Sequence, residues 1–258
     1  MRILLSNDDG VLAPGLAALY EAVADMGEIT VFAPATPQSA TGHSITLKTP
    51  LPVQRIRING NGETSFAANS VDGRPADCVR LAVRKLLPNR PDVVLAGIND
   101  GANAGVNVFY SGTVAAAAEA AMIGIPAVAF SAGYENGEPI DYGRAGRLCR
   151  WVFDRLLAIG LRKRDLITVN LPAGVPRGVR IVPQSTAELE DMYLETVDHR
   201  GMESYRLSDY YTFAHHLEGT DVGCLAKGYI TITPLHVDMT MHERLGEIND
   251  GRWDALPG

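Results

Sequence analysis

Short apolar runs alternate with helix-period segments through the first two thirds of this 258-residue chain. The strand-like runs lie at residues 3–5, 29–33, 92–98, 127–130 and 166–170. The helix-period segments lie at residues 14–26, 75–87, 113–123 and 143–159. Strands that are apolar throughout must be covered on both faces, and strands separated by helices pair in parallel. The order therefore predicts an α/β fold, with a mostly parallel sheet and helices on both of its faces.

Two regions depart from this alternation. Residues 44–59 (SITLKTPLPVQRIRIN) are rich in β-branched residues and proline, and we expect an inserted β-hairpin there. From about residue 182 the chain becomes polar and aromatic, and one strand-like run returns at residues 229–233. We therefore predict a core at residues 1–181, followed by an extended arm or small β-subdomain at residues 182–258.

The net charge of the chain argues against one class of partner. The formal net charge is −7, whereas a protein that binds a nucleic-acid backbone or duplex usually carries a basic surface. A small anionic ligand is still compatible with this charge, because a local site can hold it. Hydrophobic residues make up 46% of the chain, which is enough for a full core.

The cysteines and the apolar segments predict a cytoplasmic protein with no contact with the membrane. The three cysteines are far apart and form no CxxC pair, which is typical of a reducing compartment: Cys78, Cys149 and Cys224. The apolar stretch at the N-terminus is too short for a signal peptide. The most apolar region, residues 114–130, contains Glu119 and Pro126 and does not suit a membrane span.

Three polar loops follow predicted strands, and ligands of parallel α/β sheets bind beyond the carboxyl ends of the strands. The loops are NDDG at residues 7–10, a segment at residues 34–43 that contains Ser39, and residues 99–107. Their carboxylate, amide and hydroxyl oxygens are hard ligands that suit magnesium, manganese or calcium. Taken alone, Asp8 and Asp9 could equally form a solvated turn.

The third loop favours ligand binding. Its glycines and its asparagines each recur four residues apart, so backbone N–H groups and side-chain amides can approach a ligand closely. The loop then runs through Tyr110 into Ser111-Gly112-Thr113, where a helix is predicted to begin. Ser111 suits the N-cap of that helix, and the N-terminus of a helix attracts anions.

Other nucleotide and hydrolase motifs are missing from the sequence. There is no G-x-x-x-x-G-K-[ST] segment, which argues against a P-loop NTPase. No G-x-G-x-x-G follows the first strand, so the dinucleotide fingerprint is absent. No G-x-S-x-G elbow is present either, which argues against an α/β-hydrolase.

Several segments together resemble the SurE family, the stationary-phase survival proteins that are metal-dependent 5'/3'-nucleotidases. The similarity runs from residue 1 to about residue 240 and is densest before residue 131. Its most specific part is AGINDGANAGVNVFYSGTVAAAAEA at residues 96–120. The other parts are NDDG at 7–10, RPADCV at 74–79, NLP at 170–172 and TDVGCLAKGYITITPL at 220–235.

The resemblance implies a Rossmann-like core and an arm that is exchanged between subunits of a homodimer or homotetramer. It implies one divalent cation per subunit, Mg²⁺ or Mn²⁺, with the following ligands: Asp8, Asp9, Ser39 and Asn99. The residues that match the phosphate site are Asn103, Ser111, Gly112 and Thr113. The implied activity is removal of phosphate from nucleoside 5'- and 3'-monophosphates, and in some members from short polyphosphate.

The sequence departs from the usual family pattern at three positions. Ala40 stands where a glycine is usual, Arg74 stands where a threonine is usual, and Asn107 stands where a carboxylate is common. None of these changes removes an expected metal ligand. They bear instead on loop conformation, on substrate preference and on the turnover rate.

From these residues we expect metal-assisted hydrolysis of a phosphomonoester, in which Asp8 and Asp9 hold the cation and one of them orients or deprotonates the attacking water. The sequence does not assign that role to one of the two. Two alternatives stay open. The first is a phosphotransferase with an aspartyl-phosphate, although such enzymes usually show D-x-D-x-[TV]. The second is a nucleotide sensor without catalysis.

Overall fold

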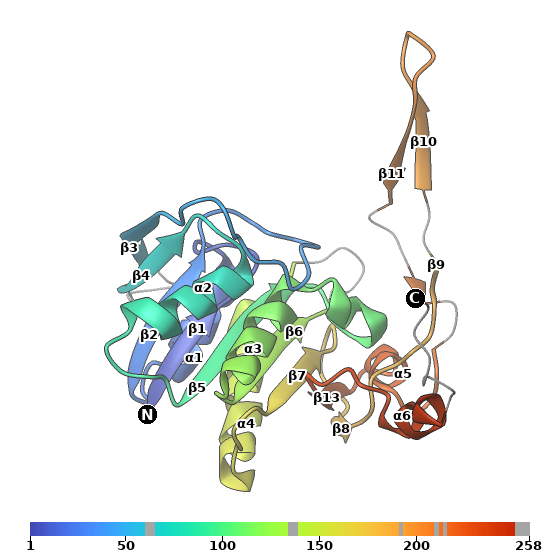
Figure 1. Ribbon diagram of the computed structural model, residues 1–258. Coiled ribbons are helices and arrows are strands. Elements are labelled where there is room, and N and C mark those ends of the chain that lie inside the picture. The colour runs from blue at the N-terminus through green and yellow to red at the C-terminus, as the bar shows by residue number, and fades with distance from the viewer. Residues whose placement is uncertain (60–64, 134–138, 191–192, 209–211, 214–215, 251–258) are drawn as a thin grey trace.

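The computed structural model describes residues 1–59, 65–133, 139–190, 193–208, 212–213 and 216–250. At its centre is a nine-stranded sheet with the order β3-β4-β2-β1-β5-β6-β7-β13-β8 (Figure 1). The strands of this sheet are β1 (Arg2–Ser6), β2 (Glu28–Pro34), β3 (Val53–Asn59), β4 (Ser65–Val71), β5 (Val93–Asp100), β6 (Ala127–Ala132), β7 (Leu166–Leu171), β8 (Val179–Ile181) and β13 (Ile230–Leu235).

The middle of the sheet is parallel, as the alternation predicts: β2, β1, β5, β6 and β7 pair in parallel from neighbour to neighbour. The helices cover both faces, which confirms the predicted fold class. Helices α1 (Pro14–Val23) and α4 (Tyr142–Ile159) pack on one face, and α2 (Pro75–Leu81) and α3 (Gly112–Ile123) pack on the other.

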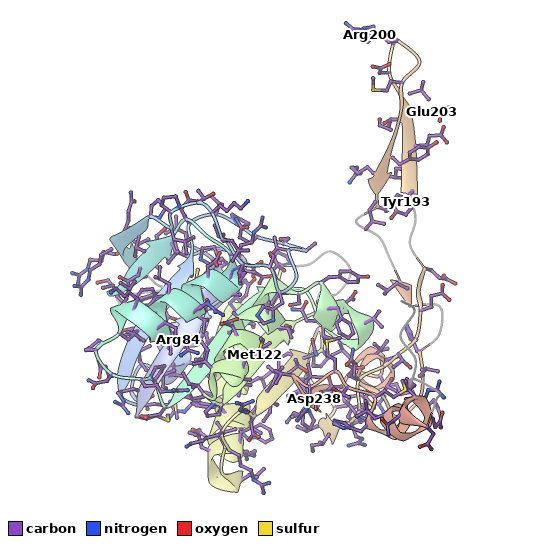
Figure 2. All side chains as sticks on the ribbon, in the orientation of Figure 1. Arg84, Met122, Tyr193, Arg200, Glu203 and Asp238 are labelled. Carbon is purple, nitrogen blue, oxygen red and sulfur yellow. The ribbon has the colours of Figure 1, made fainter. Side chains whose placement is uncertain are left out.

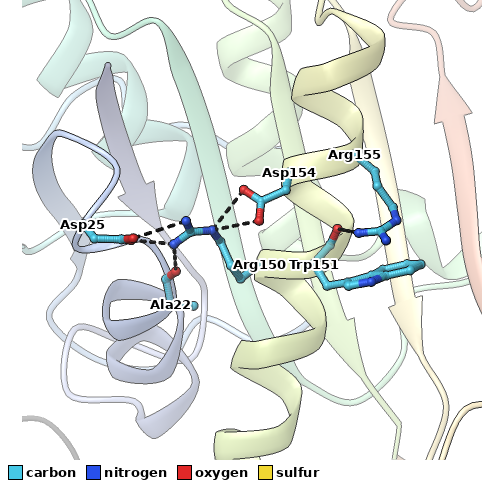
Figure 3. A network of polar contacts seen from close by, with 6 residues as sticks. All are labelled: Ala22, Asp25, Arg150, Trp151, Asp154 and Arg155. Atoms are coloured by element: carbon cyan, nitrogen blue, oxygen red, sulfur yellow. Dashed lines mark hydrogen bonds and ion pairs between the residues drawn. The ribbon is translucent and has the colours of Figure 1, made fainter.

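Alternation along the strands supplies both cores. In β1, Ile3 and Leu5 belong to the core under α1 and α4, whereas Leu4 belongs to the core under α2 and α3. The outer helices are tied together by charge as well (Figure 3). Arg150 of α4 donates to the carbonyl oxygen of Ala22 at 3.0 Å and forms ion pairs with Asp25 and Asp154. These contacts tie the C-terminal end of α1 to α4.

Two predicted helices end earlier than the sequence indicates, for local reasons. Helix α1 stops at Val23, not at residue 26. Gly27 does not cap it; a side chain there would meet the backbone of Met1, because a Cβ on Gly27 would lie 2.1 Å from the Met1 carbonyl oxygen. Helix α2 continues as a π-helix at Ala82–Leu86. The helical segment ends there because Leu87, the residue before Pro88, adopts an extended backbone.

The inserted hairpin is present, but its predicted bounds of 44–59 are wrong. It consists of β3 and β4, which pair antiparallel from Val53 with Val71 to Asn59 with Ser65. The preceding part of the expected hairpin, residues 44–52, forms no strand. Two prolines in that part, Pro50 and Pro52, have no backbone N–H to donate to a neighbouring strand.

The C-terminal region leaves the sheet and then returns to it. The predicted strand at residues 229–233 is β13, which pairs antiparallel with β7 and parallel with β8 inside the main sheet. Between β8 and β13 the chain forms a projecting hairpin of β10 (Tyr193–Val197) and β11 (Glu203–Leu207), on which Tyr193, Glu203 and Arg200 are labelled in Figure 2.

The rest of the region consists of short elements: β9 (Leu189–Glu190), β12 (Thr212–Phe213), α5 (Asp221–Ala226) and α6 (His242–Asn249). Part of the predicted arm, including residues 251–258, lies outside the described residues. The division between residues 181 and 182 stays a prediction. No helix within the described ranges is both long and apolar enough to cross a membrane.

Candidate active site

The three polar loops meet at one cleft of about 1490 Å³ at the carboxyl ends of β1, β2 and β5. One wall contains six of the residues that the sequence predicts for the site or its neighbourhood: Asp8, Asp9, Ser39, Asn99, Asn103 and Ser111. The opposite wall comes from the C-terminal region and includes Tyr193, Leu207, His216, Leu225 and Lys227. The polar wall is therefore built by the core, and the more apolar wall by the arm.

Asp8 is buried against the start of helix α3. Its side chain is 5% exposed, and the Thr113 hydroxyl donates a hydrogen bond to Asp8 Oδ1. A Cβ on Gly112 would lie 2.6 Å from Asp8 Cβ, so only glycine lets the helix approach this closely. Burial raises the pKa of the Asp8 carboxyl above its usual range, while the hydrogen bond from Thr113 acts in the opposite direction.

Asp9 is only partly buried and contacts the neighbouring loop of residues 99–107. The backbone N–H of Asp100 donates to Asp9 Oδ2 at 3.1 Å. Burial raises the pKa of Asp9 to about 7, and the negative charge of Asp8 contributes to the same shift. The ionised Asp8–Asp9 pair is therefore electrostatically unfavourable, and a bound cation would relieve this repulsion.

Asn99 and Ser39 lie beside this pair. The Asn99 side-chain amide donates to the carbonyl oxygen of Gly101 at 2.7 Å, which turns its Oδ1 toward Thr113, 3.4 Å from the Thr113 hydroxyl. Ser39 is tied to the first loop through its neighbour, because the backbone N–H of Gln38 donates to the Asp8 carbonyl oxygen at 2.7 Å.

The four residues predicted to bind phosphate fall into two groups. Asn103 and Ser111 line the cleft, and the Ser111 hydroxyl accepts from the backbone N–H of Val114 at 3.0 Å as the N-cap of α3. Gly112 and Thr113 lie behind Asp8, where Thr113 is fully buried. Gly112 and Thr113 therefore adjoin Asp8 and do not line the open cleft.

Several residues support the site although the sequence alone assigns them no role in it. Asn170 at the end of β7 accepts from the backbone N–H of Asn103 at 2.8 Å, and Ser131 accepts from the Asn103 side chain at 2.9 Å. Asp221 of α5 is fully buried and accepts from the backbone N–H groups of Gly105 and Ser185 at 2.8 and 2.7 Å. A polar residue at the end of a buried strand was the available signal for Asn170.

The donor set of the site fits a hard divalent cation. Two carboxylates, one amide oxygen and one hydroxyl face the same end of the cleft: Asp8, Asp9, Asn99 and Ser39. Among the described residues, no three His, Cys, Asp or Glu side chains gather closely enough to hold a metal ion by themselves. A cation here would thus have few protein carboxylates and keep several waters, as magnesium prefers.

Comparisons with known proteins agree with this geometry. The family model "Survival protein SurE" matches residues 3–191. The chain belongs to the SurE family. This SurE-family protein is 42% identical over 242 residues to "5'-nucleotidase SurE 1" of Thermus thermophilus, with 94% of each chain covered. It is 40% identical over 257 residues to "5'-nucleotidase SurE" of Syntrophobacter fumaroxidans, with 98% of this chain and 100% of the relative covered.

A solved structure shares the fold of this SurE-family protein. The crystal structure of the SurE protein from Aquifex aeolicus superimposes with a TM-score of 0.80 at 33% sequence identity, and the match covers 96% of this chain and 98% of that one. The similarity therefore extends beyond the core and through the C-terminal region.

Proposed function

We propose that this SurE-family protein is a nucleotidase that hydrolyses nucleoside 5'-monophosphates to nucleoside and phosphate. The observation that carries the proposal is the convergence of two carboxylates, an amide and a helix N-terminus at one end of a single cleft. The relatives named 5'-nucleotidase, which align along almost the whole chain, support the nucleotidase class.

We assign one divalent cation per subunit, Mg²⁺ or Mn²⁺, to Asp8, Asp9, Ser39 and Asn99. When bound, such a cation supplies charge stabilisation of the phosphoryl oxygens and lowers the pKa of a coordinated water. Asp8 is the buried ligand, held by Thr113. Asp9 is the more exposed carboxylate, so we assign to it the orientation of the attacking water.

The phosphoryl group is held by residues that can donate hydrogen bonds into the cleft. Ser111 Oγ accepts from the backbone N–H of Val114, so its own proton is available to a phosphoryl oxygen. The Asn103 side-chain nitrogen has two protons, of which one goes to Ser131. The N-terminal dipole of α3 adds favourable electrostatics for the anion.

Three further features belong to the same proposal and rest on the family resemblance. Activity extends to 3'-monophosphates and to short polyphosphate. The arm exchanges between subunits of a homodimer or homotetramer, which the exposed apolar side chains of Tyr193, Tyr205 and Leu207 support. The location is the cytoplasm, in keeping with three cysteines that form no disulfide.

A phosphate-release assay tests the proposal. Purified protein is supplied with a panel of 5'- and 3'-nucleoside monophosphates, tripolyphosphate and an aryl phosphate, each with Mg²⁺, Mn²⁺ or a chelator. We expect hydrolysis of nucleotides that the chelator abolishes and the cation restores. Activity that survives both the chelator and Asp9→Asn would contradict the mechanism.

The same samples separate the alternatives. A phosphorylated aspartate trapped after acid quench would favour the phosphotransferase. Tight binding of a nucleoside monophosphate without phosphate release would favour the sensor. Equal rates on the aryl phosphate and on every nucleotide would reduce the protein to an unspecific phosphatase.

A further inference from the structure

Glu119 is a buried carboxylate of the core that the proposed reaction does not use. It lies in the middle of α3, its side chain is 2% exposed, and it contacts a guanidinium and an imidazole from different parts of the chain. Arg80 of α2 donates to Glu119 Oε1 at 2.8 Å, and His43 Nε2 lies 3.0 Å from Glu119 Oε2. We call these three residues the Glu119 cluster.

The charge state of Glu119 is set by these partners. Burial alone would raise the pKa of Glu119, but the hydrogen bonds from His43 and Arg80 outweigh it and keep the pKa below the usual range. An ionised carboxylate only accepts hydrogen bonds, so His43 Nε2 must carry the proton in this contact.

His43 belongs to the loop that contains Ser39, and separate contacts hold this loop in place of secondary structure. Before Ser39, the backbone N–H of Gln38 donates to the Asp8 carbonyl oxygen at 2.7 Å. Residues 35–52 form no helix or strand, so no sheet ladder fixes Ser39. The loop is attached at two further points beyond Ser39. The backbone N–H of Gly42 donates to the Tyr110 carbonyl oxygen at 2.9 Å, and the Thr46 N–H and hydroxyl donate to Asp77 at 3.0 and 2.7 Å.

We propose that the contact between His43 and Glu119 positions Ser39 at the candidate cation site, with His43 and Glu119 as positioning residues. Helix α3 begins at Ser111 beside Asp8, and Glu119 follows two turns later on the same rigid element. Through His43, the helix that fixes Asp8 therefore also fixes the loop of Ser39. This inference rests on the proposed function for its cation, but the anchoring of the loop does not.

Arg80 provides a matched control within the cluster. It also pairs with Glu119, and its own side chain is 52% exposed, but it comes from α2 and not from the Ser39 loop. Removing either side chain takes one hydrogen-bond partner from the same buried carboxylate. Only the removal of His43 also takes a contact from the Ser39 loop.

Calorimetric titration of the metal-free protein with Mn²⁺ tests the inference directly. We expect His43→Ala to raise the Mn²⁺ dissociation constant about tenfold, as loss of a supporting contact at a metal site does. Arg80→Ala should leave this constant unchanged, although both variants should lower Tm by a few degrees. His43→Gln, whose amide can still donate to Glu119, should restore the affinity to within about threefold.

Hydrogen exchange gives a readout that requires neither metal nor activity. We expect the amides of Gly42 and Thr46 to exchange at least about tenfold faster in His43→Ala than in the wild type, and to keep their protection in Arg80→Ala. Thr46→Val, which removes the hydroxyl contact with Asp77, should weaken Mn²⁺ binding in the same direction.

The outcomes are distinguishable. Equal Mn²⁺ affinities and equal exchange rates for His43→Ala and Arg80→Ala would overturn the inference and reduce the cluster to a stabilising ion pair. A wild type that binds no Mn²⁺ would instead remove the proposed cation, and the exchange rates alone would then decide whether the cluster anchors the loop.

Discussion

The strand-end loops of the core and the hairpin β10–β11 differ in how far their side chains are buried and hydrogen-bonded. In the loops, polar side chains are buried and paired: Asp8, Asn99 and Asn103 are each less than 10% exposed and have named hydrogen-bond partners. In the hairpin, every residue of both strands is exposed, including Tyr193, Val197 and Tyr205 at 60% or more (Figure 2).

A single chain thus forms the polar wall of the cleft by itself, whereas both strands of its hairpin β10–β11 stay exposed along their whole length. The core fixes its loops through packing of α3 and α4 on the sheet, so the polar wall of the cleft forms when the core folds. A two-stranded hairpin with no packed face is marginal in water and adds little to the stability of one chain. Changes in the loops should therefore alter binding and catalysis, whereas changes in the hairpin should alter association.

The largest expected effect is at Asp8. Asp8→Asn removes the charge of the buried ligand, and we expect kcat/KM to fall by about 100-fold or more and Mn²⁺ binding to weaken in proportion. Steady-state kinetics and titration calorimetry measure both. Asp154→Asn, on the far side of the core, is the control and should change neither. An Asp8→Asn enzyme within threefold of the wild type would remove Asp8 from the reaction.

The next effect concerns the contact between the core loop and the arm. Asp221→Ala leaves the backbone N–H groups of Gly105 and Ser185 without their buried acceptor, and we expect it to lower the free energy of unfolding by about 2–4 kcal/mol. Denaturant unfolding measures this change. Glu218→Ala, at an exposed ion pair with Lys227, should leave the free energy of unfolding almost unchanged. Equal costs for the two variants would contradict the structural role of Asp221.

The pKa of Asp9 gives a pH-dependent prediction for the metal-free protein. Because this pKa is raised from 3.8 to about 7 on folding, the ionised carboxylate destabilises the folded state; the penalty is absent below about pH 4 and fully present above about pH 7. Asp9→Asn should therefore stabilise the metal-free protein by about 1–2 kcal/mol at pH 8, after allowance for its partial exposure, and by nearly nothing at pH 4.

Denaturant unfolding with a chelator at both pH values checks this effect. Excess Mn²⁺ should reverse the order, so that the wild type becomes the more stable protein at pH 8. If Asp9→Asn changes stability equally at pH 4 and pH 8, then the charge of Asp9 is not the cause.

A smaller effect is expected at Ala40, where the family usually has glycine. Ala40 has a φ of 55°, a left-handed conformation that disfavours alanine. Ala40→Gly should stabilise the protein by about 0.5–1 kcal/mol, since relief of this strain exceeds the added flexibility of the unfolded chain. Arg164→Gly, at a φ of 71° and outside the residues that line the cleft, should stabilise similarly and leave KM unchanged. Thermal unfolding of both variants measures the two stability changes, and steady-state kinetics measures KM for each.

The smallest effect on stability belongs to the hairpin. Tyr205→Ser should change the free energy of unfolding of a single chain by no more than about 0.5 kcal/mol, because Tyr205 is 60% exposed. It should instead shift the population toward smaller species in size-exclusion chromatography with light scattering. A large loss of single-chain stability would show that the hairpin packs on the core after all.

The sequence predicts the parallel core well because its signals are local. Each apolar run and each helical period lies within one element, as in β5 and α4, and the fold class follows from their order. The bounds of the hairpin β3–β4 depend on a non-local pairing, in which Val53 faces Val71, and no local pattern sets that register. The position of β13 beside β7 is likewise decided by an edge that the sequence does not reveal.

The candidate site likewise contains residues that local signals predict and residues that only non-local contacts bring together. Asp8, Asp9 and Asn99 follow predicted strands, so their meeting at one cleft could be expected from topology alone. The contacts of Asp221 with Gly105 and of His43 with Glu119 join residues more than 70 positions apart. Such pairs depend on the packed structure. Asp221 lies in a family-like segment at residues 220–235, but neither that segment nor the sequence around His43 indicates which residue is its partner.

The return of β13 to the sheet has a consequence for synthesis on the ribosome. Strand β7 ends at Leu171 and pairs on one side with β6, but its second neighbour begins only at Ile230. A nascent chain emerges from its N-terminus, so the core can fold while β7 still has an unpaired edge. Unpaired edges recruit other strands. A chain whose synthesis stops before Ile230 would keep this edge unpaired and would thus be prone to aggregate, although the polar loops of its core could already have formed.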